Sequence, residues 1–211
     1  MPREPRLLLS QSYYHVMARG NNRMTLFHDA ADYQRYLDLI GRFKAEHPFA
    51  LFHYCLMPNH VHLLVRTKSA EHFATFMKQL NLAYVHYYKR KYGWSGHLWQ
   101  GRYKSQPVGK DSYFLQCGKY IEANPKRAGL VKTPGAWRYS SYRYYATGRS
   151  DTLITPDPFF DGLGTSALER RGCYRELVVA ERVAETYKRP VWGSHRQRYQ
   201  ERQKVRRRLK V

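Results

Sequence analysis

The spacing of apolar and polar residues predicts alternating strands and helices along the first 125 residues. Strands are indicated by short runs of aromatic and β-branched residues, and helices by apolar residues recurring every three or four positions. The expected elements are, in order, a strand over 13–18, a helix from Asp29 or Asp32 to about 46, strands over 49–57 and from His60, a helix over 70–91, a strand or hairpin over 97–108, and a helix over 112–123.

This order of elements predicts a small α+β sandwich, in which a mostly antiparallel sheet carries helices on its faces. Pro58-Asn59 joins two strands so tightly that they should form an antiparallel hairpin. The pattern weakens after Trp137, and Pro156-Asp157-Pro158 suggests a boundary. We therefore expect a domain over 1–150 and an extension over 151–211 that contains a short helix from about 166 to 185.

The charge of the chain points to a polyanionic partner. Its 211 residues carry a formal net charge of +21, and 15% of them are aromatic. Basic residues interleaved with rings suit single-stranded nucleic acid, whose exposed bases can stack on aromatic side chains. The tail over 196–211 holds eight basic residues and one acid, which fits a nucleic-acid-binding arm or a solvated tail equally well.

The remaining composition narrows the class of protein. No apolar run approaches the ~20 residues needed to span a bilayer, and the N-terminal apolar segment is too short for a secretory signal. We expect a cytoplasmic protein that does not bind membranes. The three cysteines are far apart, which indicates neither a zinc ribbon nor a disulfide framework.

His60-Val61-His62 is the first candidate for chemistry. In a strand, residues i and i+2 point to the same face, so the two imidazoles can share one metal ion. Taken alone, the pair is more often two buried, hydrogen-bonded histidines. The rest of the chain must decide between the two interpretations.

The predicted helix over 112–123 leads to the second candidate. Tyr120 and Asn124 are four residues apart and lie one turn apart on one helical face. A tyrosine hydroxyl can act as a covalent nucleophile, and an amide oxygen suits a hard or borderline cation. Either residue alone has ordinary explanations, because the chain has 19 tyrosines and Asn before Pro commonly ends a helix.

The combination of these motifs resembles the HUH single-strand endonucleases, and more narrowly the REP-associated tyrosine transposases. The resemblance covers roughly residues 9–148. Its motifs are the histidine pair, Tyr120-Ile121, Asn124-Pro125, Arg127-Ala128-Gly129-Leu130, Arg19-Gly20-Asn21-Asn22-Arg23, Trp99-Gln100-Gly101-Arg102-Tyr103, and Trp137 with Ser140-Ser141-Tyr142. It implies a ferredoxin-like HUH sandwich and relates the chain to small insertion-sequence transposases.

The resemblance also implies a mechanism. His60, His62 and Asn124 would hold a divalent cation, Mg²⁺ or Mn²⁺, and Tyr120 would attack single-stranded DNA beside a hairpin-forming repeat. The products would be a 5′-phosphotyrosine and a free 3′-hydroxyl, which can rejoin DNA. Short relatives exchange catalytic helices as dimers, so a monomer and a homodimer both remain open.

Several polar residues are candidates for binding the DNA. Residues 72–110 contain no Asp or Glu, which favours a surface that tracks phosphates. The resemblance adds the segment that begins at Arg19. The candidates are Arg19, Asn21, Asn22, Arg23, Lys89, Arg90, Lys91, Arg102, Lys104, Lys126 and Arg127.

The sequence is compatible with two other functions. One is a nucleic-acid-binding protein of the same fold that performs no reaction, and the other is an RNA-processing metalloenzyme. Covalent attachment of DNA to Tyr120 would exclude the first, and cleavage that needs the 2′-hydroxyl would favour the second.

Overall fold

A computed structural model describes residues 8–109 and 112–180. Four strands form one sheet in the order β2-β3-β1-β4, and every neighbouring pair is antiparallel. The elements are β1 (Tyr13–Arg19), α1 (Ala30–Glu46), β2 (Phe49–Met57), β3 (His60–Thr67), α2 (Ala70–Tyr92) and β4 (Lys104–Pro107). This βαββαβ order is that of a ferredoxin-like fold, and it confirms the predicted α+β class.

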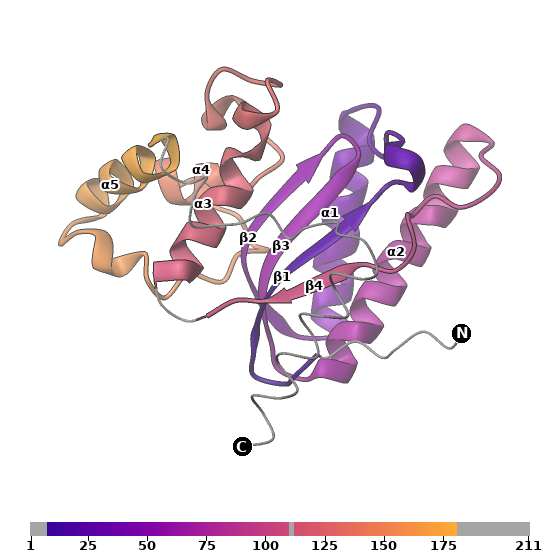
Figure 1. The fold of residues 1–211 in the computed structure, drawn as a ribbon, viewed down its shortest axis with the longest axis horizontal. Coiled ribbons are helices and arrows are strands. Elements are labelled where there is room, and N and C mark those ends of the chain that lie inside the picture. The colour runs from indigo at the N-terminus through magenta and orange to yellow at the C-terminus, as the bar shows by residue number, and fades with distance from the viewer. Residues whose placement is uncertain (1–7, 110–111, 181–211) are drawn as a thin grey trace, which may run out of the picture.

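Different helices cover the two faces of the sheet. Figure 1 shows α1 and α2 on one side and, on the other, α3 (Ser112–Arg127), α4 (Tyr142–Thr147) and α5 (Ala167–Val179). Alternation along the strands divides the core accordingly. Val16 and Leu63 pack with the cluster of α1 and α2, whereas Leu64 packs with the cluster of α3.

A β-bulge in β2 changes which residues face α3. Leu51 pairs with Val65 and His53 with Leu64, so Phe52 is the extra residue in β2. A bulge interrupts the alternation of a strand and can re-aim a side chain. Phe52 packs in the cluster of α3, and the next residue, His53, hydrogen-bonds to that same helix.

The segment after α3 extends the sheet beyond β2. Ser140 forms an isolated antiparallel bridge with Cys55, and the backbone N–H of Leu56 donates to the carbonyl of Tyr139. The Tyr139 ring stacks on Tyr33 of α1, with centroids 3.8 Å apart. These contacts cover the edge of β2, which an exposed sheet would otherwise offer to another chain.

Most element boundaries agree with the sequence analysis. Asp29 is the N-cap of α1, and it accepts a hydrogen bond from the backbone N–H of Asp32 in a capping box. The strand or hairpin predicted over 97–108 is longer than the strand in the structure, because β4 spans only Lys104–Pro107. Before it, Trp99 forms a single isolated bridge with Gly20.

The end of α3 also differs from the expectation. The helix continues to Arg127 and includes Pro125, although Pro usually disfavours a preceding helical residue.

The helix expected over about 166–185 is α5, which ends at Val179 in the described part of the chain. The basic tail over 196–211 lies outside the described residues. Among the helices that are described, none has the length and hydropathy needed to cross a membrane.

Gly118 allows α3 to approach β2 closely, and its replacement by alanine should destabilise the fold. A Cβ atom at Gly118 would lie 2.6 Å from His53 Nε2 and 2.8 Å from His53 Cδ2. We expect Gly118→Ala to lower the free energy of unfolding by about 1–3 kcal/mol in urea titrations, because overpacking outweighs the gain in helix propensity.

Gly172→Ala in α5 is the matched control for this substitution. The nearest atom to its added Cβ is Arg175 Nη2, at 3.9 Å. This variant should be as stable as the wild type or more stable by up to about 1 kcal/mol. If Gly118→Ala behaved in the same way, α3 would not pack on His53 as described.

Candidate active site

Three histidines gather on the face of the sheet that α3 covers. His60 and His62 come from β3, and their ring centroids are 4.8 Å apart. His15 of β1 stacks beside His62, with its Nε2 atom 2.8 Å from Nδ1 of His62. The predicted pair therefore shares a face, and His15 joins it. His15 also lies in a predicted strand, but the sequence pattern does not single it out.

The neighbours of the histidines indicate which ring nitrogens are available to a metal. His60 Nδ1 lies 2.6 Å from Asn59 Oδ1, which can only accept, so this nitrogen carries the proton. His62 Nε2 is buried and has no hydrogen-bond partner among the described residues. A buried nitrogen without a partner is costly unless something binds it. If His62 Nδ1 donates to His15, the Nε2 lone pair is free to take a cation.

The electrostatics keep these imidazoles neutral at pH 7, which is the form that binds metals. Burial, together with the charge of Arg19, lowers the pKa of His60 to about 4. Burial also lowers the pKa of His15, to about 3, and that of His62, with smaller contributions from neighbouring histidines. Protons therefore do not compete with a cation for these nitrogens near neutral pH.

The helix α3 brings Tyr120 to the histidines. The centroid of its ring lies 6.1 Å from that of His62 and 6.1 Å from that of His15, in edge-to-face orientations. The guanidinium carbon of Arg127 is 5.0 Å from the centre of the Tyr120 ring. A positive charge therefore lies beside the candidate nucleophile, where it would attract an incoming phosphate.

Asn124 is held one turn beyond Tyr120. Its Nδ2 donates to the backbone carbonyls of Tyr120, at 2.9 Å, and Ile121, at 3.3 Å. Because the amide nitrogen is bound to the helix, the amide oxygen is the atom that could bind a cation.

The residues from Arg19 to Arg23 lie beside the histidine pair. Arg19 pairs with His60 in the register of β1 and β3, and its Nε donates to Gln100 Oε1. The short 3-10 helix Asn21–Arg23 follows, and Asn59 Nδ2 donates to the carbonyl of Arg23. Asn22 adopts a positive φ of 47°, which Asn tolerates better than most residues. This segment and the hairpin turn together border the candidate site.

The other predicted DNA-binding residues are divided between the two faces. Lys104 lies opposite Met17, which in turn lies opposite His62, so Lys104 shares the face of the histidines. Lys126 and Arg127 occupy the last turn of α3. Arg102 is exposed just before β4. Gln106 Oε1, which the sequence analysis missed, is buried without a partner among the described residues on this same face.

By contrast, the basic residues of α2 belong to the helix that covers the opposite face. Lys89 and Arg90 are exposed there. Lys91 forms ion pairs of 2.7 Å with Asp29 and with Asp32 at the start of α1. Much of its charge is therefore already compensated within the fold, and its contact with DNA stays a prediction.

A buried polar network fixes α3 to the sheet from within. His53 Nδ1 lies 2.9 Å from Glu122 Oε1, and His53 Nε2 lies 2.9 Å from Asp157 Oδ2. Tyr174 of α5 donates to Glu122 Oε2, and Ser141 donates to Glu122 Oε1. The side chains of His53, Glu122 and Asp157 are fully buried. No motif in the sequence predicts this network, and Asp157 lies in the segment where a boundary is expected.

Within the described residues, no group of three His, Cys, Asp or Glu side chains is arranged to hold a metal ion. The donors predicted from the sequence are instead the imidazoles of His60 and His62 and the amide oxygen of Asn124. Nitrogen and oxygen donors of this kind suit Mn²⁺, and the oxygen suits Mg²⁺. The unpartnered Nε2 of His62 also fits a cation.

A sheet that presents paired imidazoles to a tyrosine on a facing helix defines a class of site suited to metal-assisted transfer of a phosphoryl group to tyrosine. Comparison with known proteins gives the family. The sequence profile described as "Transposase IS200 like" matches residues 8–124, and the chain belongs to this family of transposases. No curated protein sequence matches the chain.

Two solved structures match parts of the chain. The first is a REP-associated tyrosine transposase bound to a REP hairpin, with a TM-score of 0.59 and 19% sequence identity over 74% of this chain and 93% of that one. The second is described as a transposase from Deinococcus radiodurans, with a TM-score of 0.40 and 21% identity over 57% of this chain and 96% of that one. The first likeness confirms the fold.

The network around His53 should make the stability depend on pH above neutrality. Burial alone would lower the pKa of His53, but hydrogen bonds to Asp157 and Glu122 outweigh it and raise the pKa to about 9. An unfolded histidine loses its proton near 6.5. The resulting stabilisation is therefore complete below pH 6.5 and is lost as the pH rises to 9. We expect urea titrations to show a decrease of up to about 3 kcal/mol over this range.

Asp157→Asn provides the comparison for this pH dependence. The amide keeps the size of the side chain but removes one of the two negative charges that face His53. The pKa of His53 should then fall, and the loss of stability between pH 7 and 9 should become smaller than in the wild type. An unchanged pH dependence would contradict a protonated His53.

Proposed function

We propose that this transposase-family protein is a metal-dependent endonuclease and strand transferase that acts on single-stranded DNA beside hairpin-forming repeats. Tyr120 is the nucleophile, and His60, His62 and Asn124 hold the cation. The observation that carries the proposal is the position of the Tyr120 ring, 6.1 Å from the ring of His62, whose buried Nε2 has no partner among the described residues.

The chemistry follows from these residues. Tyr120 Oη attacks the phosphorus of a phosphodiester, the bond from phosphorus to the 3′-oxygen breaks, and the 5′-phosphate becomes attached to tyrosine. The phenolic proton passes to solvent, and the departing 3′-oxygen takes up a proton to become a hydroxyl. Bound Mg²⁺ or Mn²⁺ would polarise the phosphate and offset its developing negative charge.

The chain positions the reactants in three ways. Asn59 and His15 orient the imidazoles of His60 and His62 through hydrogen bonds. Arg127, beside Tyr120, offers a guanidinium to the phosphate. Because the phosphotyrosine conserves the energy of the broken bond, a 3′-hydroxyl of another strand can attack it and release Tyr120. The same site then joins DNA without a nucleotide cofactor.

The substrate is inferred from the fold and the charge together. The solved relative with the same fold is bound to a REP hairpin. This chain carries a net charge of +21, and Arg19, Arg23 and Lys104 border the face of the site. A hairpin with a single-stranded flank would offer phosphates to these cations and a flexible strand to Tyr120.

Tyr120→Phe should abolish covalent attachment and leave DNA binding intact. Hairpin DNA from repeats near the gene, labelled at its 3′ end, is incubated with protein and Mn²⁺, and the adduct is detected on a denaturing gel. We expect the wild type and Tyr92→Phe, on the opposite face of the sheet, to form the adduct. Tight binding without an adduct for every repeat would overturn the proposal, as would cleavage that persists in Tyr120→Phe.

His62→Ala should weaken metal binding as well as the reaction. Removing the buried nitrogen donor takes away one of the proposed protein ligands, so we expect at least a tenfold lower affinity for Mn²⁺ in titrations followed by electron paramagnetic resonance. Adduct formation should also stop in the wild type when EDTA is added. His47→Ala, outside the site on α1's C-terminal cap, is the control and should bind Mn²⁺ normally. Equal affinities in the two variants would remove His62 from the metal site.

A further inference from the structure

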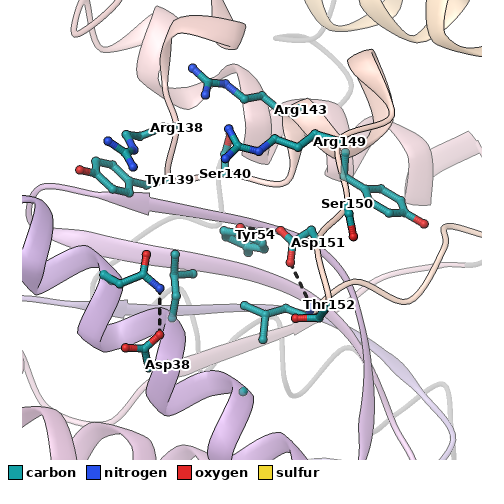
Figure 2. Close-up of a pocket in the computed structure, with 15 residues that line it drawn as sticks. Asp38, Tyr54, Arg138, Tyr139, Ser140, Arg143, Arg149, Ser150, Asp151 and Thr152 are labelled. Atoms are coloured by element: carbon teal, nitrogen blue, oxygen red, sulfur yellow. Dashed lines mark hydrogen bonds between the residues drawn. The ribbon is translucent and has the colours of Figure 1, made fainter.

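A cavity of about 430 Å³ lies between α1 and the segment over 138–153, as Figure 2 shows. Tyr54 of β2 lines it, and the ring of Tyr54 packs with the apolar cluster of α1 and α2. The cavity therefore opens on the face of the sheet opposite to α3, and the proposed reaction at Tyr120 does not use it. Its volume lies within the range of roughly 300–1,000 Å³ that is usual for small-molecule sites.

Three arginines lie along one wall of the cavity in Figure 2: Arg138, Arg143 and Arg149. Among the ion pairs of residues 8–109 and 112–180, none includes these arginines. Arg143 Nε donates to the carbonyl of Gly135, which leaves its two terminal amino groups for other acceptors. An anion in the cavity would offset the repulsion between three like charges, and guanidinium groups bind phosphate oxygens in pairs. Linked phosphates therefore suit this wall.

The wall formed by α1, across the cavity from the arginines, carries the opposite charge (Figure 2). Asp38 is exposed there and accepts one hydrogen bond, from Gln34 Nε2. Its remaining lone pairs can accept from a sugar hydroxyl or from the amino group of a base. Asp151, the second carboxylate of the cavity, already accepts from Tyr54 Oη and from the backbone N–H of Leu153. Asp38 is thus the acceptor that remains available to a ligand.

These two walls distinguish between anionic ligands. Inorganic phosphate would use the arginines, but a carboxylate beside it repels an anion that has no hydrogen to donate. A nucleotide has an anionic end for the arginines and, at its other end, hydroxyl and amino groups for Asp38. Two or three linked phosphates also match three guanidinium charges better than one phosphate does.

We propose that this cavity binds a free nucleotide with two or three linked phosphates. The phosphates bind to Arg138, Arg143 and Arg149, and the sugar or the base donates a hydrogen bond to Asp38. Binding there requires neither the cleavage of DNA nor a metal at His62.

Isothermal titration calorimetry of the full chain with ATP, GTP and pyrophosphate tests the proposal. EDTA prevents binding through a metal at the candidate active site, and about 0.15 M salt screens the general attraction of a chain with a net charge of +21. We expect the wild type to bind pyrophosphate and at least one of the nucleotides. The variant R138Q/R149Q should bind each of these at least roughly tenfold more weakly, because charge-assisted hydrogen bonds are lost.

The variant R35Q/R42Q is the matched control. Like Arg138 and Arg149, both of its arginines are exposed, but they lie on α1 outside the lining of the cavity. It removes the same charge and should bind the ligands as the wild type does. The proposal is overturned if the wild type binds no nucleotide, if the two double variants lose affinity equally, or if neither loses affinity.

Asp38→Ala tests the other wall of the cavity. Without this acceptor, the affinity for the nucleotide should fall at least about fivefold. The affinity for pyrophosphate should stay the same or rise, because a negative charge has been removed. Equal changes for the two ligands would reduce the cavity to a phosphate-binding surface and overturn the assignment to a nucleotide.

Discussion

The position of α3 depends on one buried interaction, in which His53 lies between Glu122 and Asp157. Removing one partner of a buried charged group leaves an uncompensated charge, which costs about 3–5 kcal/mol. The helix is therefore fixed where Glu122 reaches His53. At 100° per residue, Tyr120 and Asn124 lie on the side of the helix away from Glu122. The network thus sets which side of α3 remains available for chemistry.

The segment after residue 137 contributes both to the buried network around His53 and to the covered edge of β2. Asp157 and Tyr174 supply partners to the network that holds α3, and Arg138, Arg143 and Arg149 line a cavity of about 430 Å³ beside α1. A region whose sequence pattern is weak therefore shapes both the position of the helix that carries the candidate nucleophile and the covered edge of β2. In this chain α3 packs on β2 and on α5.

The sequence predicted the sheet, the long helices and the shared face of His60 and His62, because these depend on local periodicity. It also placed Tyr120 and Asn124 on one helical turn. It could not give the contacts that depend on register between distant strands, such as His15 with His62. It also missed the network, because His53, Glu122, Asp157 and Tyr174 are separated by up to 121 residues and each looks ordinary alone. The predicted length of the strand over 97–108 was wrong for a similar reason. A loosely alternating run of residues does not show how many of them pair with a neighbouring strand.

The bulge at Phe52 adds a residue to β2 without changing the register of the rest of the strand. If Phe52 were lost, Leu51 and His53 would become neighbours and would keep their partners Val65 and Leu64, so each would stay on its present face of the sheet. The deletion would instead remove the Phe52 ring from the apolar cluster that packs against α3. A chain without this residue should therefore keep the network around His53 and lose part of the apolar contact that holds α3.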